Sequence, residues 1–189
     1  MAGAAVYEST VEELEQLLTD VAERFREGDL EGAAQRVSVL FSPPYVEIWK
    51  LRARRSFAKL RKKLEVRYGK RISQQYLFMR GLQILYYSIA YSILQRLGFS
   101  SFYGSRMAWV ASGTAYMLYN DLSKGWKRTA YAKAVTCATY LEEGYDVPHA
   151  LAFKLVALAT AITFYLIRNP SPVEELYYKV EEIRQQALE

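Results

Sequence analysis

Residues 45–71 constrain the fold more than any other segment, because they combine a helical apolar pattern with a high density of positive charge. Eleven Lys and Arg stand in this segment against two acids, Glu47 and Glu65. Apolar side chains recur there every three or four residues, which places them on one stripe of an α-helix. The stripe consists of Val46, Trp49, Ala53, Phe57, Leu60, Leu64 and Tyr68. The segment therefore predicts a helix with one narrow apolar stripe and an otherwise cationic surface.

The cations of this basic helix need a partner of opposite charge. A helix of about 24 residues is roughly 36 Å long, and like charges along it repel one another unless a polyanion lies alongside. Double-stranded nucleic acid carries one phosphate charge per roughly 1.7 Å of axis, so it is the favoured partner. The residues predicted to bind it are Lys50, Arg52, Arg54, Arg55, Lys59, Arg61, Lys62, Lys63, Arg67, Lys70 and Arg71. The alternative is a solvated helix face, although such faces usually mix acids and bases at i,i+4.

The rest of the chain is also predicted to be helical, so the expected fold class is all-α. A capping box at Thr10 and Glu13 predicts a first helix at 11–27, and Asp29 is expected to cap a short second helix. Ser42-Pro43-Pro44 then breaks the chain before the basic helix, because the residue before a proline avoids the helical conformation.

Beyond residue 71 the sequence becomes rich in Tyr and Ala and predicts a compact helical bundle. Its helices are expected at 73–97, 104–120, 123–143 and 148–168, with breaks at Gly98, Asp121, Gly144 and Pro148. Ser171-Pro172 opens a final acidic helix, whose apolar face consists of Leu176, Tyr177, Val180 and Ile183. The chain therefore divides into a helical arm, residues 1–71, and the bundle, residues 72–189.

Net charge is distributed unevenly along the chain. Residues 1–44 carry −6 and residues 169–189 carry −3, whereas residues 45–71 carry +9 and residues 72–168 carry +5. The acidic ends can therefore dock on the basic helix, either within one chain or between neighbouring copies. Docking within one chain would neutralise the cations that nucleic acid needs.

Sequence motifs for catalysis are absent. There is no P-loop, no GxGxxG, no nucleophile elbow and no cluster of metal ligands. The single cysteine, Cys137, lies in an apolar helical run and is expected to be a buried, unreactive thiol. The single histidine, His149, follows a proline at a helix start and is expected to cap that helix or to lie on the surface. We therefore predict no enzymatic activity, no cofactor and no bound metal.

Two further segments contain groups suited to binding phosphate. The glycine-bounded segment 98–104 contains two serines, but a plain connection between helices is the simpler interpretation. Lys124, Lys127 and Arg128 share one helix face and form a second basic patch, with Trp126 and Lys133 nearby. This patch either extends a phosphate-binding surface or lies in solvent.

No secretory or membrane-spanning segment is predicted. Residues 1–30 lack a basic start and an apolar h-region. Polar residues interrupt the apolar segments 76–97 and 148–167, which leaves stretches shorter than the roughly 20 residues that a spanning helix needs. These segments are better interpreted as buried bundle helices, and the protein is expected to stay in the cytoplasm after synthesis.

The order of these features resembles the major coat proteins of filamentous and rod-shaped viruses of hyperthermophilic archaea. The resemblance is carried by Ser42-Pro43-Pro44 between two arm helices, by the cations from Lys50 to Arg71, and by the apolar block from Ile72 to Arg168. It is a resemblance of organisation and covers most of the chain. In that family the arm helices wrap linear double-stranded DNA in an A-like form. The subunits pack as dimers, often of two related proteins, into a helical nucleocapsid.

The resemblance implies a structural coat protein that packages double-stranded DNA non-specifically. Its expected partners are linear DNA and other copies of itself or a paralogous coat subunit, and its expected location is the virion. The bundle would face neighbouring subunits or a lipid envelope. The acidic first helix departs from the family pattern, because carboxylates do not suit direct contact with phosphate, and it is expected to pack between subunits.

Two other classes of function remain open from the sequence. In the first, the protein is a cytoplasmic helical regulator or adaptor, whose basic helix docks on an acidic protein or reads the major groove of DNA. In the second, it binds membranes peripherally, with Trp49 and Phe57 as interfacial residues. The basic helix contains Arg and Lys but no Asn or Gln, which favours contact with phosphate over reading of bases.

Overall fold

Every regular element in the described part of the chain is a helix, which confirms the all-α prediction. The structure is a computed structural model that describes residues 2–69 and 71–178, with side chains described from residue 10 onward. Its helices are α1 (Ala2–Arg26), α2 (Leu30–Val37), the 3-10 helix η1 (Ser38–Phe41), α3 (Val46–Tyr68), α4 (Gln74–Arg96), α5 (Ser101–Ser123), α6 (Lys127–Tyr145) and α7 (His149–Arg168). A further helical segment covers residues 171–178.

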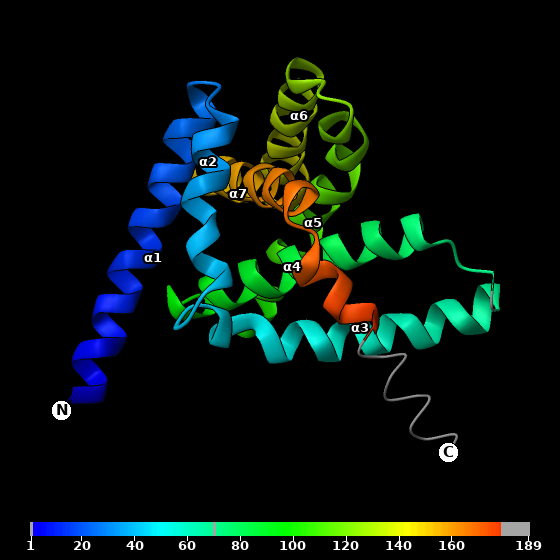
Figure 1. Ribbon diagram of the computed structural model, residues 1–189. Coiled ribbons are helices and arrows are strands. Elements are labelled where there is room, and N and C mark those ends of the chain that lie inside the picture. Colours follow the sequence, from blue (N-terminus) through cyan, green and yellow to red (C-terminus); the bar gives the residue numbers. More distant parts are fainter. Residues whose placement is uncertain (1, 70, 179–189) are drawn as a thin grey trace.

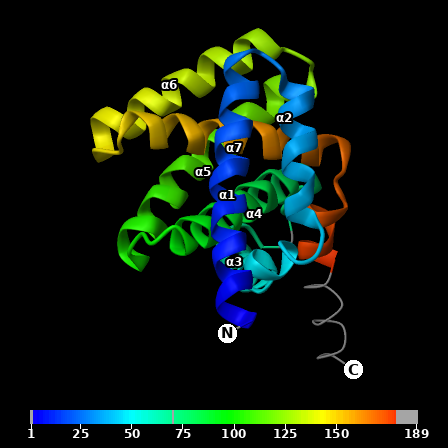
Figure 2. The same ribbon diagram turned by 90° about the vertical axis from the view of Figure 1, so that its left-hand side faces the viewer.

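Helix α7 is the central helix around which the other helices pack (Figures 1 and 2). It contacts α1, α2, α5 and α6, and every residue from 155 to 164 is buried. Its length and apolar composition would suffice to cross a membrane, contrary to the prediction from its polar interruptions, but most of its residues are buried inside the protein. The buried hydroxyl of Tyr86 on α4 donates a hydrogen bond to the carbonyl oxygen of Leu155 (2.8 Å). Helix α7 is therefore the core of a helical bundle, as predicted for this segment.

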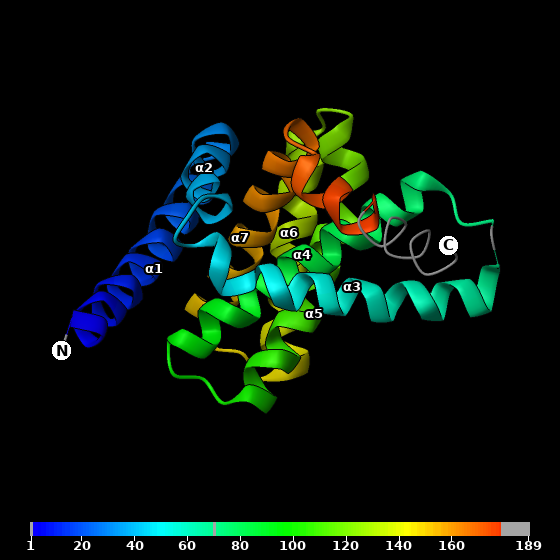
Figure 3. The same ribbon diagram turned by 60° about the horizontal axis from the view of Figure 1, so that its bottom comes forward.

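Helices α3 and α4 form an antiparallel hairpin whose far end extends beyond the other helices (Figures 1 and 3). At the near end, the indole Nε1 of Trp49 donates a hydrogen bond to the carbonyl oxygen of Leu40 in η1 (2.7 Å). The segment 171–178 approaches the hairpin closely at Gly81, where a Cβ atom would lie only 2.8 Å from Val173 Cγ1. Other elements thus enclose the near end, whereas the far end is built from α3 and α4.

Two helix boundaries follow the local signals in the sequence. The carboxylate of Asp29 accepts a hydrogen bond from the backbone nitrogen of Gly32 (2.9 Å), as expected of an N-cap residue. Gly69 ends α3 with a φ of 64°, a left-handed conformation that glycine adopts without a steric penalty. The basic helix therefore ends at Tyr68 and does not continue to residue 71.

Other predicted boundaries were wrong. Helix α1 begins at Ala2 and not at residue 11, because the Ala-rich residues before the capping box favour continuation of the helix. Helix α5 begins at Ser101, so most of the segment 98–104 belongs to its first turn and is not a loop.

The predicted break at Asp121 was also wrong. Helix α5 continues through Asp121 to Ser123, and the chain reverses at Gly125, which has a φ of 77°. In the last helical segment, Leu176 and Tyr177 are buried as predicted, whereas Val180 and Ile183 lie outside the described residues. The division into an arm and a bundle at residue 71 remains a prediction, and one buried apolar cluster joins residues from both parts.

Candidate nucleic-acid interface

The predicted apolar stripe faces the protein interior along most of α3. Trp49, Ala53, Phe57 and Leu64 are buried, and Val46 and Leu60 are partly buried. Tyr68 departs from the prediction, because it is exposed and packs edge-on against the ring of Tyr76. The burial of Trp49 and Phe57 removes the two residues that the membrane-binding alternative would place in the lipid interface.

Arg52 is held by the protein and does not face solvent freely. Its guanidinium carbon lies 3.9 Å from the ring centroid of Tyr91 on α4, a cation–π contact. Its Nη2 also donates a hydrogen bond to Oε1 of Gln95 (3.4 Å). Tyr91 stacks on Tyr87, whose ring meets Trp109 of α5 edge-on. Arg52 therefore ties α3 to the rest of the bundle.

Three further cations of α3 have a carboxylate in their surroundings. Lys50 and Arg54 line a cavity of about 160 Å³ between α3 and the segment 171–178, and Glu175 contributes to its wall. Farther along the helix, Nε of Arg61 forms an ion pair with Oε1 of Glu65 at 3.1 Å. The acidic C-terminal segment thus lies beside the first half of the basic helix.

The remaining cations of α3 form what we call the outer basic face. It consists of Arg55, Lys59, Lys62, Lys63 and Arg67, which are all exposed. At about 1.5 Å per residue this face is roughly 18 Å long. Its first four members form no ion pair or hydrogen bond with another side chain in the described residues, and Arg67 lies over the ring of Tyr68 (5.3 Å). Arg71 is exposed in the following loop, and Lys70 lies outside the described residues.

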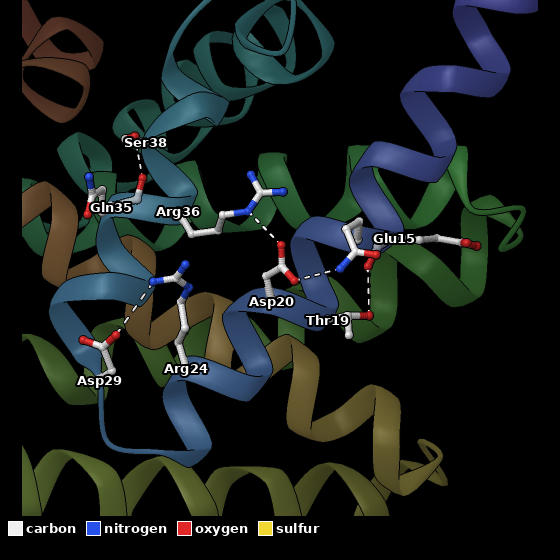
Figure 4. Close-up of polar contacts among 9 residues, drawn as sticks. Glu15, Thr19, Asp20, Arg24, Asp29, Gln35, Arg36 and Ser38 are labelled. Carbon is white, nitrogen blue, oxygen red and sulfur yellow. Dashed lines mark hydrogen bonds and ion pairs between the residues drawn. The ribbon is translucent and has the colours of Figure 1, made fainter.

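Helix α1 does not cover the outer basic face. It packs against α2 and α7, and α1 and the far end of α3 lie on opposite sides of the molecule (Figures 1 and 3). Figure 4 shows how α1 is fixed to α2 by Asp20, which faces Arg36. A hydrogen bond from Gln16 (2.8 Å) and the ion pair with Arg36 (3.1 Å) hold the pKa of Asp20 below its usual value. The acidic first helix therefore leaves the outer basic face uncovered.

The second basic patch lies at the other end of the molecule, where the α1–α2 turn meets the start of α6 (Figures 1 and 2). Lys127 and Arg128 line a groove of about 400 Å³, together with Arg26 at the end of α1 and Glu27 of the following turn. Nζ of Lys127 lies 3.8 Å from Oε1 of Glu31. The patch therefore does not extend the outer basic face.

Lys124 does not share a helix with Lys127 and Arg128, which corrects the prediction, because α5 ends at Ser123 and α6 begins at Lys127. Lys124 and Lys133 are each occupied by a local contact. Nζ of Lys124 lies 4.7 Å from the ring centroid of Trp126. Lys133 forms an ion pair with the buried carboxylate of Asp121 (2.8 Å). Arg26 was not predicted to belong here, because only the fold brings the end of α1 to the start of α6.

The candidate catalytic side chains do not converge on a site. His149 is exposed, as predicted, and its Nδ1 contacts Oε1 of Glu142. Cys137 is only partly buried, which corrects the prediction, because the side chain it meets, Met117, is itself exposed (Sγ to Sδ 3.9 Å). Among the described residues, no group of three or more His, Cys, Asp and Glu side chains is arranged to hold a metal ion.

Comparisons of this chain with protein-family models, with curated proteins and with solved structures found no match. The function of the outer basic face is therefore inferred from its own residues and their geometry.

Proposed function

We propose that this protein binds double-stranded DNA without reading its sequence, through the outer basic face of α3. The observation that carries this proposal is the set of exposed cations on a projecting helix, Lys59, Lys62 and Lys63 among them, that have no carboxylate partner in the described structure. Phosphate contacts position a protein on DNA and carry no sequence information directly. The helix offers neither Asn nor Gln to read adenine.

We further propose that the protein is a structural coat subunit that packages linear DNA in a helical nucleocapsid, with neither catalysis nor a cofactor. The order of a proline-broken arm, a basic helix and a bundle supports this assignment through its resemblance to archaeal virus coat proteins. Large apolar side chains on α5 and α6, such as Trp109, Met117 and Tyr140, are exposed on the bundle. Exposed aromatic residues and Met suit contacts between subunits.

The binding reaction is tested by its dependence on salt. Neutralising about six phosphates gives a slope of about −5 in a plot of log affinity against log salt, because each contact releases about 0.9 counterions. We expect this slope or a steeper one with linear duplexes of unrelated sequence. A slope near zero, or a strong preference for one sequence, would contradict non-specific binding and favour the regulator.

Two variants with equal loss of charge locate the contact. Lys59→Gln/Lys62→Gln/Lys63→Gln should make the slope shallower by about 3, because three phosphate contacts are lost. Lys124→Gln/Lys127→Gln/Arg128→Gln removes the same charge from the second basic patch and should leave the slope nearly unchanged. Equal effects of the two variants would show that net charge, and not the outer basic face, determines binding.

Electron microscopy of the purified protein with and without linear double-stranded DNA tests the packaging function. Regular filaments that contain DNA are the expected result. Small discrete particles that DNA does not change would contradict the coat function and favour an adaptor. Binding to anionic but not to neutral vesicles, without binding to DNA, would instead indicate a peripheral membrane protein.

A further inference from the structure

The molecule exposes a second charged helix face, of opposite sign to the outer basic face. Four exposed carboxylates lie along one side of α1 and its end, and we call them the acidic face: Glu12, Glu15 and Glu23 of α1, and Glu27, which directly follows the helix. Positions spaced by 3, 8 and 4 residues in this way share one stripe at about 3.6 residues per turn. None of the four forms an ion pair with another described side chain. Arg24 and Arg26 are also exposed at the end of α1, so the negative charge is strongest over residues 12–23.

The acidic face cannot reach the outer basic face of its own chain. Leu14, Val21 and Phe25 of α1 are completely buried, and the ion pair between Asp20 and Arg36 ties α1 to α2. Moving α1 onto α3 would expose these core residues to water. The two faces therefore remain separate within one molecule, and each is left without a partner of opposite charge in the described structure.

We propose that, in the absence of nucleic acid, the acidic face of one copy docks on the outer basic face of a second copy. The two faces match in dimensions, since the acidic face is roughly 22 Å long and the basic face roughly 18 Å. They also match in charge, with four carboxylates against five cations. A contact between two different surfaces closes into a dimer when it is reciprocal and propagates along a chain of subunits when it is not.

Nucleic acid competes with this contact for the same cations. Exposed ion pairs between proteins are individually weak, whereas a duplex presents a continuous row of phosphates and gains from counterion release. DNA should therefore displace α1 from the outer basic face. This competition rests on the proposed function, but the docking itself rests only on the two exposed faces.

The docking is tested on the full-length protein freed of nucleic acid, by sedimentation velocity. Between roughly 0.1 M and roughly 1 M salt the Debye length falls from about 10 Å to about 3 Å, so we expect self-association at low salt and monomers at high salt. A protein that stays monomeric at low salt, or associates equally at both, would overturn the proposal.

Charge reversal on each face identifies the surfaces. Glu12→Lys/Glu15→Lys and Lys59→Glu/Lys62→Glu should each abolish association at low salt, and an equimolar mixture of the two variants should restore it. The matched control is Glu142→Lys/Glu143→Lys, which changes the charge as much as the first variant but leaves both faces intact and should associate as the parent does. Association of both reversed variants alone, or a mixture that stays monomeric, would overturn the proposal.

Thermal unfolding and circular dichroism confirm that each variant is folded before it is compared. A short linear duplex added to the associated protein should then release it as DNA-bound subunits. Because the salt and charge-reversal arms contain no DNA, failure of DNA binding alone would count against the proposed function and leave the docking intact. If the charge-reversal variants do not behave as expected while DNA binding is normal, the docking proposal is overturned and the proposed function stands.

Discussion

The two halves of α3 have similar density of positive charge but differ in how the protein uses it. In the first half, residues 46–57, Arg52 stacks on Tyr91 and two other cations line a cavity beside the C-terminal segment. In the second half, residues 58–68, the three lysines Lys59, Lys62 and Lys63 are exposed and form no ion pair in the described structure. A run of cations in a sequence therefore does not by itself show how many of them can bind a partner.

The difference in charge follows a difference in packing. The first half contributes Trp49, Ala53 and Phe57 to the buried core, whereas the second half contributes Leu64 alone. Figure 3 shows why: the first half runs alongside the bundle, and the second half projects with α4. The projecting half of α3 has fewer apolar contacts, but its cations stay hydrated and accessible to a polyanion.

Truncation of Phe57 and Leu64, one buried residue from each half of α3, should show the difference in packing most strongly. Phe57 is completely buried, so Phe57→Ala should lower the free energy of unfolding by about 3–5 kcal/mol. Leu64→Ala should cost less, about 2 kcal/mol, because the cavity that it leaves lies at the projecting end, where neighbouring side chains can move into it. Urea unfolding with unchanged m-values measures both effects. A larger loss from Leu64→Ala would show that the far end is the better packed half.

Paired substitutions within α3 compare the charges of the two halves directly. Lys59→Gln/Lys62→Gln should make the salt slope of DNA binding shallower by about 1.8, because two phosphate contacts are lost at about 0.9 each. Lys50→Gln/Arg54→Gln removes the same charge beside Glu175 and should change the slope by less than about 0.5. Fluorescence anisotropy with one labelled duplex at several salt concentrations gives both slopes. Equal changes would mean that DNA contacts the whole length of the helix.

Much of this arrangement was predictable from local sequence signals. The all-α fold and the cap at Asp29 were correctly predicted, and the predicted apolar stripe of α3 is buried at Trp49 and Phe57. These features depend on residues within one or two helical turns of each other, and such spacing can be read directly from a sequence. The DNA-binding role of the cations remains a prediction.

The features that were missed depend on residues far apart in the chain. The partner of Arg52 is Tyr91, and Glu175 lines the same cavity as Arg54. Nothing in the segment 45–71 distinguishes Arg52 from Arg55, although the fold places one over a ring, partly buried, and exposes the other. The availability of each cation is therefore a property of tertiary structure, and a single sequence cannot show it.

Substitution of Arg52 has the smallest expected effect. It tests most specifically whether a cation in the first half of α3 is held by the protein or is available to DNA. Loss of its cation–π contact and its hydrogen bond to Gln95 in Arg52→Gln should cost about 1 kcal/mol of stability. For a protein of this size that corresponds to a fall in Tm of about 2–4 °C. The salt slope of DNA binding should not change, because the guanidinium faces Tyr91 and not the solvent. Arg52→Lys keeps the charge over the ring and should recover part of the stability. A slope shallower by about 1 with unchanged stability would instead place Arg52 on the phosphate backbone, and the boundary between the two halves of α3 would then lie nearer to its first turn.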